Sequence, residues 1–390
     1  MYNIKTFNKI SNLGLQRFPA SHYQVGSDIE RPTGYLLRSH KLHGDLLPDT
    51  LQAVARAGAG VNNIPVEDCT RRGIVVFNTP GANANAVKEL VLAGLLLGSR
   101  DILAGVNYVN TLTDITDATA MSQLLEAEKK RFAGNELMGK SFGVVGLGAI
   151  GSMVAEMALA LGMKVVGYDP ALSVEAAWRL PSQVQRMENL QSLLSASDYV
   201  SLHVPAVEAT HHMINSESLA SLRKGAVLLN FAREAIVDSR AIVAALETGQ
   251  LRRYVCDFPE PCLLGRNGVI AMPHIGASTA EAEDNCAVMA AEQLMDYLEN
   301  GNIRNSVNFP PISMARNNGT RLAFGNENVS GVLGHVLSIL AYHQVNVLDM
   351  VNKSRDQVAY NIIDLEQAPD TAVIESIRKV EHVIKVRVLA

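Results

Sequence analysis

The chain has 390 residues, of which 48% are hydrophobic and 19% are charged, and its formal net charge is −5. At about 100 to 200 residues per domain, this length predicts two or three domains, and the composition excludes a disordered chain. The small negative charge excludes a surface built to bind nucleic acid or an anionic membrane. The four cysteines are too few and too irregularly spaced for a disulfide framework or a metal site. The longest apolar stretch, around residues 90–97, is too short to span a membrane, so we expect a cytoplasmic protein.

The first hundred residues alternate short β-rich runs with helical patterns, which is typical of an α/β unit. Strands are predicted over residues 34–38, 51–55 and 74–77. A helix is predicted over residues 83–100, where apolar residues recur every three to four positions. The polar segment 110–135 that follows tolerates helix and predicts a bridge between domains.

From residue 140 the pattern becomes a series of short apolar runs, each followed by a helix, as in a buried parallel sheet. Six strands are predicted, over residues 141–145, 164–168, 199–203, 226–230, 253–257 and 268–271. Together they predict a doubly wound sheet. A helix over 279–300 ends at Asn300-Gly301, a typical stop signal, and a linker rich in Asn and Pro covers residues 302–318.

The remaining residues have a different rhythm of elements. Strands are predicted over 320–324, 346–352, 358–365 and 383–389, and helices over 330–343 and 371–380. This βαββαβ order predicts a ferredoxin-like α+β domain. The apolar stripe on its first helix is interpreted as core that faces the sheet.

A glycine pattern follows the first strand of the doubly wound region. Gly146, Gly148 and Gly151 form GxGxxG at a strand-to-helix turn, where they permit a tight turn, a close approach to a pyrophosphate and close helix packing. Asp169 ends the next strand, near the offset at which an acid receives the ribose hydroxyls of NAD. An acid there repels the 2′-phosphate of NADP, so NAD is the expected cofactor. The alternative is a glycine turn without a ligand and an aspartate that only closes a turn.

Three charged residues lie at or just beyond strand ends of the same region: Arg233, Glu260 and His274. Open α/β sheets bind ligands at this edge. Oxidation of a 2-hydroxy acid needs a base for the hydroxyl proton, a cation for the carboxylate and a carboxylate that orients the imidazole. These three side chains match those roles. Individually they can equally be a surface ion-pair arginine, an exposed loop acid and a histidine satisfied by backbone groups.

Several motifs resemble those of the D-isomer-specific 2-hydroxyacid dehydrogenases. The resemblance lies in Gly-Leu-Gly-Ala-Ile-Gly at 146–151, Asn-Phe-Ala-Arg-Glu-Ala-Ile-Val-Asp at 230–238 and His-Ile-Gly-Ala-Ser-Thr at 274–279. Residues 55–60 and 78–85 resemble the substrate-domain motifs of that family, and the tail resembles its ACT regulatory domain. The implied fold is α/β: a Rossmann NAD domain (102–273) inserted in a flavodoxin-like substrate domain (1–101 and 274–312), followed by an ACT domain (318–390).

The resemblance also implies site residues. His274 would be the acid/base, Glu260 its partner and Arg233 the carboxylate clamp, although the loop between Asp257 and Glu260 is two residues shorter than is common in the family. Cofactor contacts would come from Gly146, Gly148, Ala149, Ile150, Gly151, Asp169, His203, Val204, Pro205, Ala232, Asp257, His274 and Gly276. Besides Arg233, the carboxylate and phosphate of a small phosphorylated substrate would be received by Arg38, Ser39, Arg56, Gly60 and Asn83. Ordinary solvated surface arginines are the alternative for Arg38 and Arg56.

An ACT domain implies a homo-oligomer, a dimer or a tetramer, with an amino-acid effector such as L-serine. The expected effector residues are Asn326, Asn328 and Asn346, which can equally cap a helix and close a turn. Two other functions stay open. One is a dehydrogenase of the same family that acts on hydroxypyruvate or glyoxylate, D-lactate or 2-hydroxyglutarate. The other is an NAD-sensing binding protein of the corepressor type.

Overall fold

The computed structural model describes residues 1–317 and 319–389. The chain forms two compact units, Met1–Asn83 with Ala280–Ala390, and Ala84–Thr279. The helix α3 (Ala84–Ser99) belongs to the second unit, although the sequence placed it with the substrate domain. Its glycine face explains this. A Cβ at Gly94 would lie 2.9 Å from the ring of Phe231 and one at Gly98 would lie 2.9 Å from Val227, so these glycines let the helix pack directly on the second sheet.

The first unit contains a five-stranded parallel sheet in the order β2-β1-β3-β4-β5. Its strands are β1 (Tyr2–Thr6), β2 (Tyr23–Gly26), β3 (Gly34–Leu37), β4 (Ala53–Arg56) and β5 (Val75–Phe77). Its helices are α1 (Asn12–Leu15), α2 (Val66–Arg71) and α11 (Ala280–Asn300). This 2-1-3-4-5 order is the flavodoxin-like order that the resemblance implies. The sequence analysis did not identify β1 and β2, because β1 buries only Ile4 fully and lacks a continuous apolar run.

The second unit contains a seven-stranded parallel sheet in the order β12-β11-β10-β9-β6-β7-β8. Its strands are β6 (Ser141–Val145), β7 (Lys164–Tyr168), β8 (Gln185–Arg186), β9 (Tyr199–Leu202), β10 (Ala226–Asn230), β11 (Leu251–Cys256) and β12 (Val269–Ala271). Counted from β6 this is the doubly wound order 3-2-1-4-5-6, extended by one strand, so the predicted Rossmann sheet is confirmed. The topological switch point lies between β6 and β9.

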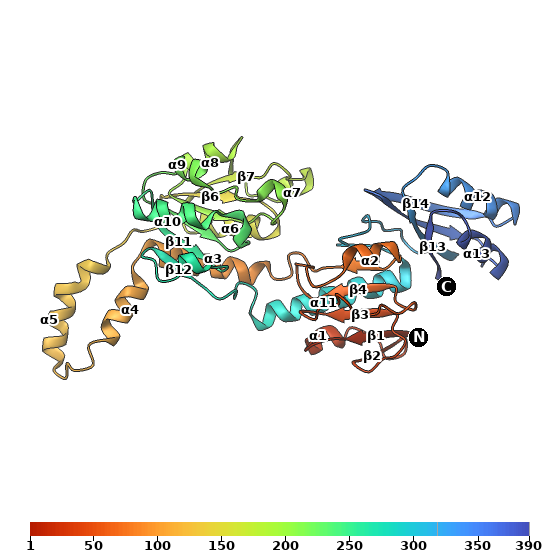
Figure 1. Ribbon diagram of the computed structural model, residues 1–390, viewed down its shortest axis with the longest axis horizontal. Coiled ribbons are helices and arrows are strands. Elements are labelled where there is room, and N and C mark those ends of the chain that lie inside the picture. Colours follow the sequence, from red (N-terminus) through yellow and green to blue (C-terminus); the bar gives the residue numbers. More distant parts are fainter. Residues whose placement is uncertain (318, 390) are drawn as a thin grey trace. The chain divides into compact units, whose positions relative to one another are not determined.

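Helices accompany this sheet and also extend away from it. Those of the sheet are α3, α6 (Ala149–Ala160), α7 (Val174–Trp178), α8 (Leu190–Ala196), α9 (Ser216–Ala220) and α10 (Ser239–Glu247). The polar segment predicted as a bridge forms α4 (Ile102–Asn110) and α5 (Ala118–Glu128). These two helices project as a hairpin from the body of the unit (Figure 1).

The last residues form a four-stranded antiparallel sheet in the order β14-β15-β13-β16. Its elements are β13 (Thr320–Glu327), α12 (Val332–Tyr342), β14 (Val347–Arg355), β15 (Val358–Leu365), α13 (Thr371–Arg378) and β16 (Val383–Leu389). The predicted ferredoxin-like order is therefore confirmed. Val336 and Leu340 of α12 are buried against this sheet, as the interpretation of the apolar stripe requires.

Two buried arginines attach this C-terminal domain to the rest of the first unit. Arg321 on β13 is fully buried and forms a bidentate pair with Asp364, at 2.6 and 2.8 Å. Its remaining N–H groups donate to the carbonyls of Asn300, Met314 and Ala315. All five donors of this guanidinium are thus satisfied. Arg387 on β16 donates to carbonyls near the end of α11 and lies over the ring of Tyr297, 4.3 Å from its centroid.

Candidate functional site

The glycine turn between β6 and α6 has the geometry of a pyrophosphate cradle. Gly146 has φ +87°, and a Cβ there would lie 2.5 Å from the carbonyl oxygen of His203, directly after β9. A Cβ at Gly151 would lie 1.9 Å from the carbonyl oxygen of Gly146. Gly148, the N-cap of α6, is exposed, and a Cβ there would meet nothing within 4 Å. Two glycines are therefore required by packing, whereas Gly148 leaves open space at a helix N-terminus where a phosphate group fits.

Asp169 lies directly after β7, next to this turn. One carboxylate oxygen accepts from the backbone N of Leu147 at 2.8 Å and the other accepts from the N of Ala171 at 2.9 Å. The acid is thus fixed beside the glycine loop by backbone donors. Each oxygen keeps a lone pair for a ribose hydroxyl, so the residues present fit an NAD molecule.

His203 follows β9 on the other side of the switch point. Its Nε2 lies 2.9 Å from the hydroxyl of Ser201, and burial lowers the pKa of the imidazole to about 3. The ring is therefore neutral at physiological pH, and an uncharged planar ring suits contact with the adenine base of NAD. Val204 is partly buried and Pro205 is exposed, so both lie at the surface of the same edge.

Arg233 and His274 are brought together by a residue that the sequence analysis did not single out. The guanidinium carbon of Arg233 lies 5.0 Å from the centroid of the Phe258 ring. The imidazole of His274 lies 4.3 Å from the same centroid, centroid to centroid. The two polar groups therefore both pack against the ring of Phe258.

Asp257 fixes the backbone that carries His274. Its buried carboxylate accepts from the backbone N of Ile275 at 2.8 Å and from that of Gly276 at 2.7 Å. His274 has φ +56°, a left-handed conformation that is unusual for a residue other than glycine. The two hydrogen bonds hold the turn around this residue, so Asp257 positions the imidazole in addition to any contact with a cofactor.

Asn230 supports the arginine in a similar way and was not identified from the sequence. It is fully buried at the end of β10, donates to the carbonyl of Arg233 at 2.9 Å and accepts from the N of Ala232 at 3.1 Å. A buried amide directly before the predicted clamp is the signal that could have revealed it. Glu260 is exposed, and within residues 1–317 and 319–389 the structure records no hydrogen bond or ion pair between Glu260 and His274. Their partnership remains a proposal.

The predicted substrate residues gather in the first unit, at the carboxyl ends of β3 and β4 and in the loops beyond. Arg56 donates through Nε to the carbonyl of Arg38 at 2.9 Å and through Nη1 to that of Gly60. Arg38 forms an ion pair with Glu283 of α11 at 2.6 Å, and Ser39 beside it is exposed. The buried Oδ1 of Asn83 has no hydrogen-bond partner, and an orphaned acceptor of this kind suits a ligand donor.

The three predicted effector residues lie at two ends of the C-terminal sheet. Asn326 is buried within β13 and accepts from Asn361 at 2.8 Å, and the N of Asn328 donates to the carbonyl of Gln357, just before β15. The carbonyl of Asn346 accepts from the N of Glu366, just after β15. At about 3.3 Å per residue these ends are about 30 Å apart, so one chain alone cannot close the three around one small ligand.

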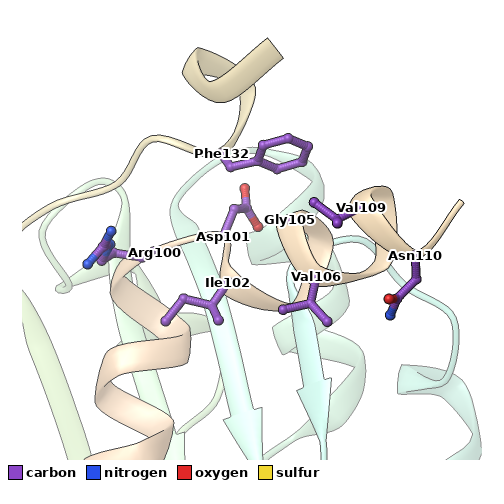
Figure 2. Close-up of a pocket in the computed structure, with 8 residues that line it drawn as sticks. All are labelled: Arg100, Asp101, Ile102, Gly105, Val106, Val109, Asn110 and Phe132. Atoms are coloured by element: carbon purple, nitrogen blue, oxygen red, sulfur yellow. The ribbon is translucent and has the colours of Figure 1, made fainter. Parts of the chain in front are cut away.

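The α4/α5 hairpin contains a shallow cavity of about 390 Å³, shown in Figure 2. It is lined by Arg100, Asp101, Ile102, Gly105, Val106, Val109, Asn110 and Phe132. No residue of α4 or α5 is fully buried, and Val106 and Val109 are 52% and 47% exposed. Among the described residues, no helix is long and apolar enough to cross a membrane and no cluster of three metal-ligating side chains is present.

Comparison with known proteins places the chain in a family. The sequence profile of the D-isomer specific 2-hydroxyacid dehydrogenase NAD binding domain matches residues 106–276. A D-3-phosphoglycerate dehydrogenase of Haemophilus influenzae is 33% identical over 343 residues, which cover 85% of this chain and 79% of that protein. The chain belongs to the D-isomer-specific 2-hydroxyacid dehydrogenase family. It is thus an oxidoreductase with an NAD-binding domain.

Other relatives differ more in length or in identity. A D-3-phosphoglycerate dehydrogenase of Methanocaldococcus jannaschii is 37% identical over 270 residues, 68% of this chain, but the match spans only 49% of that protein. The chain thus matches about half the length of some curated relatives. The solved structure of the TT0316 protein from Thermus thermophilus covers 78% of this chain and 99% of its own, with 28% identity and a TM-score of 0.62. Sheet order and family assignment therefore agree.

Proposed function

We propose that this protein is an NAD-dependent D-3-phosphoglycerate dehydrogenase, which oxidises 3-phosphoglycerate to 3-phosphohydroxypyruvate at the start of L-serine synthesis. The observation that carries the proposal is the pairing of Arg233 and His274 across Phe258, in the unit that also holds the glycine turn. Relatives named D-3-phosphoglycerate dehydrogenase support the choice of substrate.

In the proposed reaction the C2 hydroxyl of the substrate becomes a ketone. NAD held by the glycine turn and Asp169 would supply the acceptor for the hydride that leaves C2. His274 takes the hydroxyl proton, and Glu260 would stabilise the resulting imidazolium. Arg233 binds the carboxylate through its planar fork and polarises the C2 oxygen. Its own Nη1 donates to the carbonyl of Ala232 at 2.6 Å, which orients the guanidinium before substrate arrives.

The phosphate of the substrate would be received by the cluster in the first unit. Arg38 and Arg56 supply the cations, and the Gly60 backbone and Ser39 supply donors. The unpartnered Oδ1 of Asn83 would accept from a hydroxyl of the substrate rather than contact the phosphate. An arginine pair of this kind matches the bidentate geometry and the double charge of a phosphate monoester. A substrate without a phosphate would not make these contacts, and Arg38 would keep its ion pair with Glu283.

The deciding experiment compares purified enzyme on three keto acids in the direction of NADH oxidation: 3-phosphohydroxypyruvate, hydroxypyruvate and 2-oxoglutarate. We expect kcat/KM to be at least about a hundredfold higher for the phosphorylated substrate, because two charge-assisted contacts are lost without it. Equal turnover of hydroxypyruvate would contradict this and favour another member of the family. NADH binding without turnover of any keto acid would favour an NAD-sensing binding protein.

We also propose that the protein acts as a homo-oligomer, with the α4/α5 hairpin covered by a second copy. Apolar residues of α4, among them Val106 and Val109, are about half exposed and would be buried further by self-association. Val106→Asp should reduce the mass measured by light scattering, whereas Lys129→Asp, at an exposed residue directly after α5, should not. An unchanged mass in Val106→Asp would exclude this interface.

The C-terminal domain would bind an amino acid, with L-serine as the first candidate. Since Asn328 and Asn346 lie at opposite ends of β15, a closed site needs residues from two chains. Serine should therefore slow turnover of the oligomer, and both Asn328→Ala and Asn346→Ala should abolish that inhibition without changing the uninhibited kcat. Inhibition that persists in both variants would place the effector elsewhere.

A further inference from the structure

Two cations lie close together where β16 of the C-terminal domain meets the loops of the first sheet. A cavity of about 260 Å³ opens there, and both Arg72 and Lys385 line it. Arg72 directly follows α2, a helix of the domain that contains the five-stranded sheet, and Lys385 lies on β16. The two cations therefore come from two different domains of one compact unit.

Both cations are held in place by hydrogen bonds to backbone carbonyls. Lys385 donates through Nζ to the carbonyl of Leu51 at 2.6 Å, and Arg72 donates through Nη1 to that of Leu47 at 2.7 Å. Gly73 fixes the contact between the domains, because its φ is +66° and a Cβ there would lie 2.6 Å from the Cβ of Lys385. The two charges are thus preorganised by contacts with the protein backbone.

The charge of the cavity is incompletely compensated. Asp49 accepts from Nη2 of Arg72 at 2.9 Å, but its side chain is fully exposed and its contribution is screened by solvent. The other charged groups that act on Lys385 are Arg72 and Arg387, both positive. Burial and these arginines lower the pKa of Lys385 to about 8. The environment therefore raises the free energy of the protonated ammonium. An oxyanion would relieve this cost.

We propose that this cavity binds a small dianionic oxyanion of the phosphate type, held between Arg72 and Lys385. Two cations with fixed orientation match the two charges of a phosphate group. The walls formed by Leu51, Ile74 and Ile384 add an apolar side that a short organic body can contact. Bound there, the anion would link the C-terminal domain to the first sheet through both charges.

This position is separate from the proposed substrate site, and its test requires no turnover. Inorganic phosphate is titrated calorimetrically into the full chain, at constant ionic strength, in an Arg38→Gln background that weakens the competing phosphate site. Saturable binding is expected in this background. Arg72→Gln and Lys385→Met should each weaken it at least about tenfold. The neighbouring Arg71→Gln, whose side chain is exposed and paired with Asp68, is the matched control and should bind normally.

Two further measurements sharpen the result. Affinity should fall as the pH rises above about 8 in the Arg38→Gln protein, since Lys385 then loses its proton, and this dependence should vanish in Lys385→Met. Propyl phosphate tests the contribution of the apolar walls. It should bind more tightly than inorganic phosphate, because its propyl group can contact them. The proposal is overturned if phosphate fails to saturate up to about 10 mM. Unchanged binding in the folded Arg72→Gln variant overturns it as well.

Discussion

Arg38 and Glu283 form an ion pair at 2.6 Å, so the guanidinium proposed to receive the substrate phosphate is already engaged by a carboxylate. Both side chains are partly exposed, at 39% and 46%, and such pairs contribute at most about 1 kcal/mol. A phosphorylated substrate must displace Glu283 or bind beside it. The carboxylate therefore opposes substrate binding by charge and by occupancy.

Glu283→Gln should lower the KM for the phosphorylated substrate by up to about fivefold, the equivalent of about 1 kcal/mol, and leave kcat unchanged. The measurement is steady-state kinetics at low ionic strength, where exposed charges are least screened. Glu281→Gln, on the same helix and also exposed, is the control and should have no effect. A raised KM in Glu283→Gln would mean that this residue helps to bind the substrate.

Substitutions at Gly148 and Gly151 should affect different properties, the first cofactor binding and the second stability. Gly148→Ala adds a methyl group into open space, so the melting temperature should be unchanged while NADH binding weakens about tenfold or more by steric exclusion of the pyrophosphate. Gly151→Ala places a Cβ 1.9 Å from a backbone oxygen and should lower the melting temperature by several degrees. Thermal unfolding and NADH fluorescence titration measure the two effects. Normal NADH affinity in Gly148→Ala would exclude the glycine turn as the pyrophosphate site.

Loss of Arg321 should be among the most destabilising single changes in the C-terminal domain. Arg321→Met leaves the buried carboxylate of Asp364 without its cation, and removing one partner of a buried pair costs about 3 to 5 kcal/mol. Urea denaturation followed by circular dichroism measures the loss. The double variant Arg321→Met with Asp364→Leu should recover part of it, because neither charge then remains buried. Equal stability of the single and double variants would show that the carbonyl contacts of Arg321 dominate instead.

The partly buried His203, whose pKa is lowered by desolvation, predicts acid sensitivity of the second unit. Its folded pKa is about 3, below the ordinary value of 6.5, so below pH 6.5 the unfolded chain binds a proton that the folded chain does not. The free energy of unfolding should therefore fall as the pH drops below 6.5, by at most about 1.4 kcal/mol per pH unit from this residue. His203→Gln should have a shallower decline between about pH 6.5 and 5, measured by thermal unfolding, than the parent chain. Identical slopes would assign the acid sensitivity to other groups.

The sequence alone determined the layered α/β fold, because continuous apolar runs that are buried on both faces of a sheet leave a local signal. The strands β6, β7, β10, β15 and β16 have the predicted bounds. The sequence motif also identifies glycines at positions where a Cβ would clash with backbone atoms, as at Gly146 and Gly151. The weakly patterned strands β1 and β2 were missed because their pairing depends on distant partners.

The tertiary structure decided what no local pattern encodes. Phe258 between Arg233 and His274, and Asp257 beneath the left-handed turn of His274, are contacts between segments that only the folded sheet brings together. The assignment of α3 to the second unit likewise depends on glycines that contact another element. Isolated polar residues that lie far apart in the chain form no repeating pattern in the sequence. Their roles follow only when the fold converts separation along the chain into distance in space.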